Sequence, residues 1–403
     1  MSTKGWRYWC AYAVMIAPNA AVGLTLAAMP PILPELAARL GSDRAAQLVT
    51  SVSGFGMIVG GLFSGRLLER TGVRQFTLAS LVIYGVFGTL GWFLSGALAM
   101  GLSRFVLGMG GVFFSTAALA LTAATFTGEA RSRVIGLQQA TSQVVNVCAV
   151  FIVGALVAVT GWRGAFLLYG AFAVVLFVLA LLGVSRSLST AGVGDTPATV
   201  TDGATGGALS AGGATSAASS SRFLRNIAPV CALTTLMGIL TVIPMAQLPF
   251  VLAANGQGSP QQVSLVLGVN FVFAAISAMS FARLTGRFGK PATFMAGLTC
   301  GMAGIALMGL THGLDWSCVA AALAGLGTGI YNTYVFDHGV EISPPVYHGR
   351  AAGLLFAFMF FGAFINPLVA GAFAQLFGLH HSFPAMAAVA VLCGLPVILA
   401  RRA

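Results

Sequence analysis

The sequence predicts an all-α, polytopic membrane protein with twelve transmembrane helices in two pseudo-symmetric six-helix bundles. Of its 403 residues, 58% are hydrophobic and only 7% are charged, whereas a soluble chain carries about 25% charged residues. Apolar runs of about 18 residues or more, long enough to cross a bilayer as a helix, recur throughout the chain. Because lipid offers the backbone no hydrogen-bond partners, these runs must be helical.

A short charged loop occurs twice and indicates an internal duplication. The first copy is 65–74 (GRLLERTGVR), between two apolar runs, and the second is 282–290 (ARLTGRFGK). The matched pairs, each 217 residues apart, are Arg70/Arg287, Gly72/Gly289 and, in a second pair of loops, Arg133/Arg350. Two loop types in one register favour a repeated unit over chance similarity.

The apolar runs divide into twelve helices, six on each side of a polar linker. In the first half we expect helices at 8–31, 47–65, 75–95, 98–126, 134–159 and 163–184. In the second half we expect them at 224–251, 262–283, 291–311, 317–341, 350–377 and 382–400. The charged loops end the second and eighth helices, and a turn at Gly161 separates the fifth from the sixth. Prolines that would bend or end the first and seventh helices near their outer ends are Pro30, Pro31, Pro244 and Pro249.

The segment 185–221 is expected to be a disordered cytoplasmic linker. It consists mostly of Ala, Gly, Ser and Thr, so it cannot bury apolar surface. It divides the chain into an N-terminal bundle, 1–184, and a C-terminal bundle, 222–403. A flexible chain of this length spans roughly 30–35 Å on average, which joins two bundles without fixing their relative position.

The distribution of basic residues predicts the orientation in the membrane. If the N-terminus lies inside, sixteen basic residues fall on the cytoplasmic side and three on the outer side. The outer three are Arg39, Arg44 and Arg163. Because cytoplasmic loops carry the excess of Lys and Arg, we expect a multi-pass protein of the cytoplasmic (inner) membrane with both termini cytoplasmic.

Several functional classes are disfavoured by composition and motif content. The net charge of +11 is spread over separate short loops, which does not indicate a nucleic-acid surface. The six cysteines lie in apolar runs without C-x-x-C spacing, so we expect buried hydrophobic residues instead of disulfides or metal ligands. There is no H-E-x-x-H, G-x-S-x-G or Walker motif. We therefore expect neither an enzyme nor a cofactor or metal site.

The charged loop carries a resemblance to a known family. The segment 65–74 resembles the signature loop of the major facilitator superfamily, G-x-L-x-D-R-x-G-x-K/R, with Glu69 in place of the usual Asp. The second copy departs further, with Ala282 for the first glycine and Gly286 for the acid. Segments that resemble other family patterns are 104–110 in the fourth helix, 161–166 before the sixth, and 341–345 followed by Gly349-Arg350 after the tenth. The resemblance implies two bundles that rock around a central cavity and open it to each side in turn.

The resemblance also implies that the charged loops bracket a cytoplasmic gate. Charges at helix ends can pair with one another and with helix dipoles, and such pairs can form in one state and break in the other. Glu341 is expected to pair with Arg287 or Lys290. The expected gate residues are Gly65, Glu69, Arg70, Gly72, Arg74, Arg287, Gly289, Lys290 and Glu341.

Two charged residues within the spans are candidates for the transport chemistry, since intramembrane charges are costly and face the protein interior. Arg104 lies deep in the fourth predicted span and would anchor substrate, take part in proton coupling or cap helix carbonyls. Asp337 lies four residues before Glu341, on the same helix face. Because burial disfavours a charged carboxyl, Asp337 is a candidate proton carrier.

Uncharged polar residues within the spans could line a cavity or form hydrogen bonds between helices. The fifth predicted helix carries a polar stripe at i, i+4 and i+7 that consists of Gln139, Gln143 and Asn146. The other polar candidates within the spans are Asn19, Asn270, Tyr331, Asn332 and Asn366.

The sequence therefore favours a secondary active transporter for a small polar or anionic organic molecule. We expect proton-coupled efflux by a monomer whose partners are the substrate, protons and the lipid bilayer, with no nucleic acid. One alternative is proton-coupled uptake of an organic anion, with Arg104 as the counter-charge. The alternative of another class is a transporter-like membrane sensor.

Overall fold

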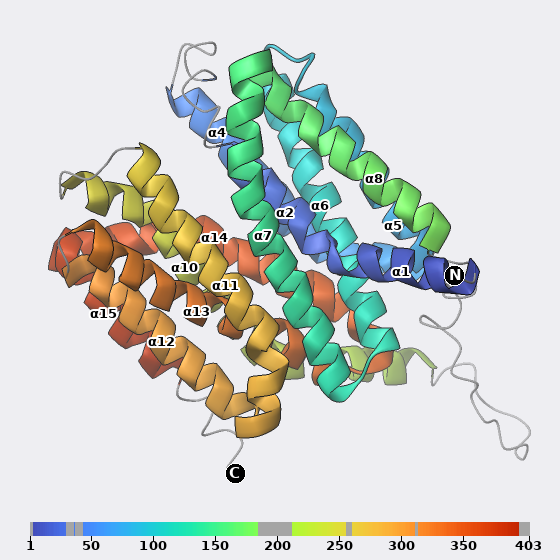
Figure 1. The fold of residues 1–403 in the computed structure, drawn as a ribbon. Coiled ribbons are helices and arrows are strands. Elements are labelled where there is room, and N and C mark those ends of the chain that lie inside the picture. Colours follow the sequence, from blue (N-terminus) through green and yellow to red (C-terminus); the bar gives the residue numbers. More distant parts are fainter. Residues whose placement is uncertain are drawn as a thin grey trace, which may run out of the picture.

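The computed structural model describes residues 3–29, 36, 43–183, 212–254, 260–310 and 313–394, and every regular element among them is helical (Figure 1). The first half contains α1 (Thr3–Ile16), α2 (Pro18–Ala27), α4 (Asp43–Thr71), α5 (Val73–Leu90), α6 (Ala97–Thr125), α7 (Gly128–Thr160), η2 (Trp162–Phe166) and α8 (Leu167–Gly183). The second half contains α10 (Gly212–Ala254), α11 (Pro260–Phe288), α12 (Lys290–Leu310), α13 (Leu314–Glu341), η3 (Pro345–Tyr347), α14 (His348–Phe377) and α15 (Leu379–Gly394).

These elements confirm the predicted twelve-helix arrangement, with one correction to the first helix. The predicted helix at 8–31 consists of two pieces, α1 and α2, which are interrupted at Ala17. Pro18 is the first residue of α2. Proline lacks a backbone N–H and is best tolerated in the first turn of a helix, which fits a break directly before it. Pro244 and Pro249, by contrast, do not end the seventh helix, because α10 continues through both to Ala254.

The duplication extends over nearly all of each half. The bounds of α4 recur 217 positions later as those of α11, and α6 and α13 begin with the same offset. Gly72 and Gly289, which precede α5 and α12, have φ values of 75° and 81°. Such positive φ values favour glycine, and they allow the chain to turn from one helix directly into the next. The turns at Gly161 and Gly378 form a second pair with this offset and conformation.

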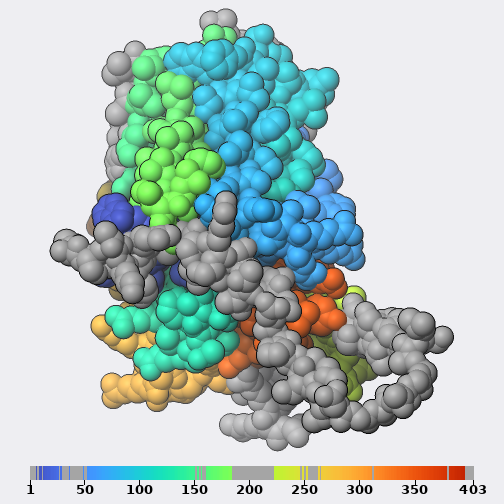
Figure 2. Space-filling view, turned by 90° about the vertical axis from the view of Figure 1, so that its right-hand side faces the viewer, coloured from blue at the N-terminus to red at the C-terminus, as the bar shows by residue number. Residues whose placement is uncertain are grey.

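Eight of the described helical segments are long and apolar enough to cross a bilayer by length and composition. They correspond to α5, α6, η2–α8, the 222–245 part of α10, α11, α12, α13 and η3–α14. The other members of the twelve-helix arrangement are α1–α2, α4, α7 and α15. Figure 2 shows α5 in blue and α8 in green side by side on one outer face. Their exposed valines, Val82 and Val86 on α5 and Val174 on α8, suit contact with lipid.

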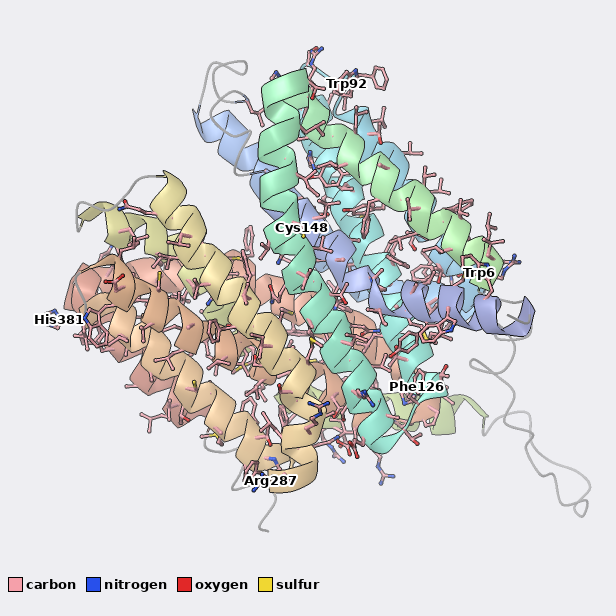
Figure 3. The ribbon with its side chains drawn as sticks, viewed as in Figure 1. Trp6, Trp92, Phe126, Cys148, Arg287 and His381 are labelled. Carbon is pink, nitrogen blue, oxygen red and sulfur yellow. The ribbon has the colours of Figure 1, made fainter. Side chains whose placement is uncertain are left out.

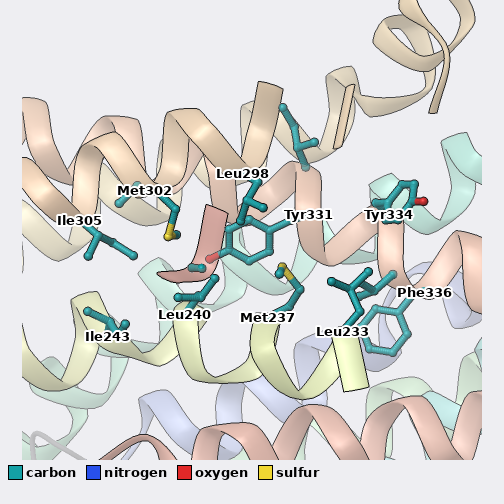
Figure 4. Packing of buried hydrophobic residues seen from close by; sticks show 14 of the residues in the cluster. Leu233, Met237, Leu240, Ile243, Leu298, Met302, Ile305, Tyr331, Tyr334 and Phe336 are labelled. Carbon is teal, nitrogen blue, oxygen red and sulfur yellow. The ribbon is translucent and has the colours of Figure 1, made fainter. Parts of the chain in front are cut away.

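The buried core consists mainly of two clusters, and the larger one, centred in the second half, also includes first-half residues such as Met57, Val112 and Leu119. In the second half, α10, α12 and α13 enclose the side chains shown in Figure 4, with Met237 and Leu240 facing Leu298, Met302 and Tyr331. In the first half, α2, α5, α6 and α8 surround a separate core. Glycines spaced four residues apart allow close packing within each half: Gly56 and Gly60 lie against α6, and Gly325 and Gly329 lie against α11.

The two halves meet mainly along two pairs of helices, α4 with α14 and α7 with α11, with further contacts of α6 with α14 and of α7 with α13. The α4–α14 contact is a seam of small residues. A Cβ added to Gly65 would lie 2.5 Å from the Cα of Arg350, and one added to Gly61 would lie 2.7 Å from the backbone nitrogen of Ala357. On the other side Gly136 of α7 lies against the carbonyl of Ala278 on α11. Backbones can approach this closely only without intervening side chains.

One end of the molecule holds the α4–α5, α6–α7, α11–α12 and α13–α14 connections, and we refer to it as the charged end. Figure 3 shows Phe126 and Arg287 at this end, whereas Trp92 and His381 lie at the opposite ends of their halves. The distribution of basic residues predicts that the charged end faces the cytoplasm.

Two expectations differ from the structure or lie beyond it. α10 begins at Gly212, so this helix reaches back into the segment 185–221 that the sequence assigns to the linker. The remainder of that segment, 185–211, lies outside the described residues. All six cysteines are free, but only Cys10 and Cys231 are buried as expected; Cys300 and Cys318 are half-buried, and Cys148 (Figure 3) and Cys393 are exposed. A small apolar side chain suits contact with lipid as well as a protein core, so exposure of these cysteines carries little cost in a membrane.

We predict that Gly65→Ala destabilises the folded protein by about 1–3 kcal/mol, because the new methyl group would collide with the backbone of α14. The matched control is Gly54→Ala on the same helix, since a Cβ at Gly54 meets no atom within 4 Å. Equilibrium unfolding in mixed micelles measures both free energies. Equal stability of the two variants would contradict the close seam.

Candidate functional site

The first ion pair between the halves joins Glu69 to Arg350 at the charged end. Glu69 lies in the last turn of α4, and Arg350 lies in the first turn of α14. The Glu69 Oε2 atom accepts from Arg350 Nε at 3.0 Å and lies 2.8 Å from a terminal guanidinium nitrogen. Both side chains are partly buried, with 22% and 35% of their surfaces exposed. This two-nitrogen contact fixes the approach of the helices as well as neutralising the acid.

The second cluster is built around Asp337 of α13, whose side chain is fully buried. Arg131 Nε lies 3.1 Å from Oδ1, and the Ser132 hydroxyl donates to Oδ2 at 2.9 Å; both residues belong to α7, in the other half. Lys290 Nζ lies 2.6 Å from Asp337 Oδ2 and 2.8 Å from Glu341 Oε2. Asp337 therefore receives partners from both halves, and one acid–base network holds α7 against α13.

Helix ends reinforce both clusters. Arg131 and Ser132 lie in the first turns of α7, which begins at Gly128, and Arg350 lies two residues after the start of α14. A helix N-terminus carries a partial positive charge, so each carboxylate from one half lies near the positive end of a helix from the other half. Each carboxylate is therefore stabilised both by basic side chains and by the dipole of a helix.

The two clusters are not copies of each other. By the repeat register, the position of Glu69 corresponds to Gly286 on α11, which carries no acid. In the second half the carboxylate comes instead from Asp337 on α13, and it faces α7 of the first half. Sequence reasoning named Glu69 and Asp337 but missed Arg131, Ser132 and Arg350 as their partners. A usable signal existed for Arg350, since it is the repeat partner of Arg133 in a cytoplasmic loop.

The remaining predicted gate residues lie around these clusters with different surroundings. The sequence predicts Arg287 or Lys290 as the partner of Glu341, and the structure shows Lys290. The guanidinium carbon of Arg287 lies instead 5.4 Å from the centre of the Phe288 ring. Arg70 is exposed in the last turn of α4, and Arg74 is half-buried in the first turn of α5. Among the described residues, the ion pairs across the halves are those of Glu69 and Asp337.

Arg104 lies in an aromatic cage within the first half. Its guanidinium carbon is 4.6 Å from the centre of the Phe166 ring and 4.7 Å from that of Tyr169. Its two terminal nitrogens have no hydrogen-bond partner among the described residues. The contacts with Phe166 and Tyr169 are cation–π interactions between α6 and the start of η2–α8. These two contacts lie within the first half and favour a packing role for Arg104.

The polar stripe of α7 lies against α2. Gln143 and Asn146 form a hydrogen bond of 3.2 Å with each other, and Asn146 lies directly against Gly23 of α2. The Ser142 hydroxyl donates to the carbonyl of Asn19 at 2.9 Å. These residues and Gln139 form a polar patch on α2 and α7, in which Gln143 is half-buried and the other predicted residues are buried.

The polar candidates of the second half are engaged in contacts between helices. Asn270 donates to the Ala321 carbonyl on α13, and Asn366 donates to the Ile239 carbonyl on α10, both at 2.9 Å. Asn332 exchanges hydrogen bonds with Thr241 on α10. Tyr331 points into the core between α10 and α12 (Figure 4) and contacts the Thr328 hydroxyl at 3.0 Å. These contacts favour a structural role for the four residues.

We predict a measurable coupling energy between Glu69 and Arg350. The single variants Glu69→Gln and Arg350→Gln should each destabilise the protein, and the double variant should cost less than their sum by about 1 kcal/mol, the coupling expected for a partly exposed ion pair. Equilibrium unfolding of the four proteins in mixed micelles measures the cycle. Additive effects would show that the contact contributes nothing.

We also predict that Asp337→Asn destabilises the protein by about 3 kcal/mol or more, because Arg131 and Lys290 lose the anion between them. The matched control is Asp315→Asn, the same change in the exposed first turn of the same helix. That control should cost less than about 1 kcal/mol. Similar unfolding free energies for the two variants would contradict the assigned network.

Comparisons with known proteins identify the fold and the family. The family model of the Major Facilitator Superfamily matches residues 19–252 and 230–403. Among solved structures, the human organic anion transporter MFSD10 (TETRAN) is 15% identical with a TM-score of 0.74, and covers 98% of this chain and 99% of its own. The proton:xylose symporter XylE, bound to 6-bromo-6-deoxy-D-glucose, is 14% identical with a TM-score of 0.77, and covers 98% and 95%. At these identities the likeness shows the fold alone. No curated protein sequence matches the chain. With both repeats matched by the family model, the chain belongs to the Major Facilitator Superfamily of membrane transporters.

Proposed function

We propose that this protein exports a small polar or anionic organic molecule by alternating access, driven by the proton gradient, with the charged end as its cytoplasmic gate. The observation that carries the proposal is the pair of ionic clusters at one end of the molecule. Glu69 and Asp337 each pair with a cation from the other half. For this end to open, both contacts must break, as a two-state gate requires.

The Asp337 cluster supports proton coupling. Its two carboxylates, Asp337 and Glu341, face two cations, Arg131 and Lys290, so the four charges balance. A proton bound to Asp337 would remove one negative charge and leave Arg131 and Lys290, from opposite halves, with an excess of positive charge between them. Their repulsion would favour separation of the halves at this end. Proton binding would thereby shift the population toward the open gate.

The polar patch on α2 and α7 supports a polar substrate. Amide groups donate and accept hydrogen bonds, so Gln143 and Asn146 can bind hydroxyl, carbonyl or carboxylate groups. Gln143 is half-buried, which leaves part of its amide accessible. Efflux is proposed by analogy with exporters of the same superfamily, since the chain carries no sugar-porter signature.

Uptake of an organic anion is the second candidate, and the observation that favours it is the pair of unpaired terminal nitrogens on Arg104. A buried guanidinium without hydrogen bonds is unfavourable, and an incoming anion would satisfy it. MFSD10, which shares the fold at 15% identity, is described as an organic anion transporter. The aromatic cage around Arg104 argues for a packing role and keeps this candidate second.

Metabolite profiling of cytosol and medium separates the two directions. A deletion strain is compared with strains that express the wild type or Arg104→Gln. A compound that is trapped in the cytosol of the deletion strain and returned to the medium by the wild type supports export and identifies the substrate. A compound that the deletion strain leaves in the medium, and that the wild type but not Arg104→Gln consumes, supports uptake and contradicts export.

We predict that Asp337→Asn separates transport from the proton gradient. In proteoliposomes with equal amounts of folded protein, substrate exchange should persist, whereas accumulation driven by a pH gradient should fall at least about fivefold. Asp315→Asn serves as the control and should retain both activities. Normal gradient-driven accumulation by Asp337→Asn would contradict proton coupling at this residue.

A further inference from the structure

A lateral cavity of about 1060 Å³ lies at the charged end, between α1, α7 and α11. Trp9 and Tyr12 line it from α1, Arg133 from α7, and Met279 and Arg283 from α11. The cavity therefore spans the seam between the two halves, because α7 belongs to the first half and α11 to the second. It is separate from the Glu69 and Asp337 clusters, none of whose residues lines it.

The charges of the cavity walls favour an anion. Arg133 and Arg283 are both exposed, one from each half, and neither has an ion pair among the described residues. The acidic lining residue is Glu129, one helical turn before Arg133, so these three side chains leave one positive charge in excess. Two guanidinium groups on opposite walls suit a phosphate, which accepts several hydrogen bonds at once.

The other walls favour an amphiphile over a soluble anion. Ile276 and Met279, on the outer face of α11, are 50% and 59% exposed, and both line the cavity. Ile276 lies seven residues before Arg283, which is about two turns or 10 Å deeper along the helix. Trp9, also on the rim, is 61% exposed. The cavity thus has an apolar wall, and above it a rim with two arginines and the indole ring of Trp9. This order matches the boundary between acyl chains and headgroups in a bilayer.

We propose that this cavity binds an anionic glycerophospholipid of the cytoplasmic leaflet, with its phosphate between Arg133 and Arg283 and an acyl chain along Ile276 and Met279. The proposal rests on the proposed function for the placement of the charged end in the cytoplasmic leaflet. The lipid phosphate bridges the two halves beside Gly136 and Ala278, where α7 and α11 are in close contact. It therefore stabilises the closed gate, and the lipid composition of the membrane sets the balance between the two states.

Native mass spectrometry of the purified full chain tests the proposal. The protein in detergent is titrated with phosphatidylglycerol, phosphatidylethanolamine and phosphatidylcholine of equal chain length. Wild type should retain phosphatidylglycerol most strongly, and Arg133→Ala and Arg283→Ala should each weaken that retention about fivefold. Arg225→Ala, which removes an exposed arginine of α10 outside the cavity, is the matched control and should retain the lipid as the wild type does.

A second variant tests the apolar wall without removing charge. Met279→Trp fills the cavity from an exposed position, so it should fold normally and displace phosphatidylglycerol. Retention that is unchanged in Arg133→Ala, in Arg283→Ala and in Met279→Trp would overturn the site. Equal retention of the three lipids would overturn selection of an anionic headgroup, and displacement by soluble sn-glycerol 3-phosphate at equal concentration would overturn the lipid as occupant. This assay measures lipid binding and involves no transport. A negative result here would therefore overturn the lipid site without contradicting proton-coupled transport, and a negative result in the proteoliposome assay would contradict proton coupling without contradicting the lipid site.

Discussion

The structure depends on neutralising two carboxylates that lie at the boundary between its halves. Asp337 is fully buried, so an unpaired charge there would be strongly unfavourable, whereas Glu69 is partly exposed and gains less from its partner. Glu69 and Asp337 each pair with a cation of the opposite half, and each lies near a helix N-terminus of that half. Among the described residues, the first half has no ion pair with Glu69. Asp337 has Lys290 in its own half, but Lys290 is shared with Glu341, so Arg131 of the opposite half supplies the second positive charge of the cluster. Association of the halves at the charged end follows from this requirement as much as from apolar packing.

The small residues of the seam make the ionic contacts geometrically possible. Gly61 and Gly65 bring α4 against the backbone of α14, and Gly136 brings α7 against α11. Larger side chains would hold the helix axes apart and lengthen the distance from Glu69 to Arg350. Because lipid and apolar side chains interact about equally well with helices, contacts made by small residues can separate at little cost. The glycines of the seam thus allow the helices to approach closely, whereas the ion pairs favour the closed state of the charged end over the open state.

The fold could be predicted from the sequence because its signals are local. Apolar runs give the helices, and the repeated loop gives the register that α4 and α11 follow. The site was harder to predict, since a sequence gives the depth of a residue in the membrane but not the direction in which it points. Arg104 and Tyr331 have the depth of cavity residues, yet they point into aromatic and apolar cores. Arg131 has the sequence context of an ordinary cytoplasmic arginine, and only the crossing of α7 over α13 places it beside Asp337.

The central claim is that the ionic clusters hold the charged end closed, and a distance across that end tests it most directly. Gln75 on α5 and Ala292 on α12 are exposed there and are repeat partners, so spin labels on cysteines at these positions report the separation of the halves. The six native cysteines are replaced first. Double electron–electron resonance spectra are then recorded with and without the pair of substitutions Glu69→Gln and Asp337→Asn. The account predicts one short distance for the unsubstituted clusters and an additional longer distance for the double variant. Identical distance distributions would contradict it.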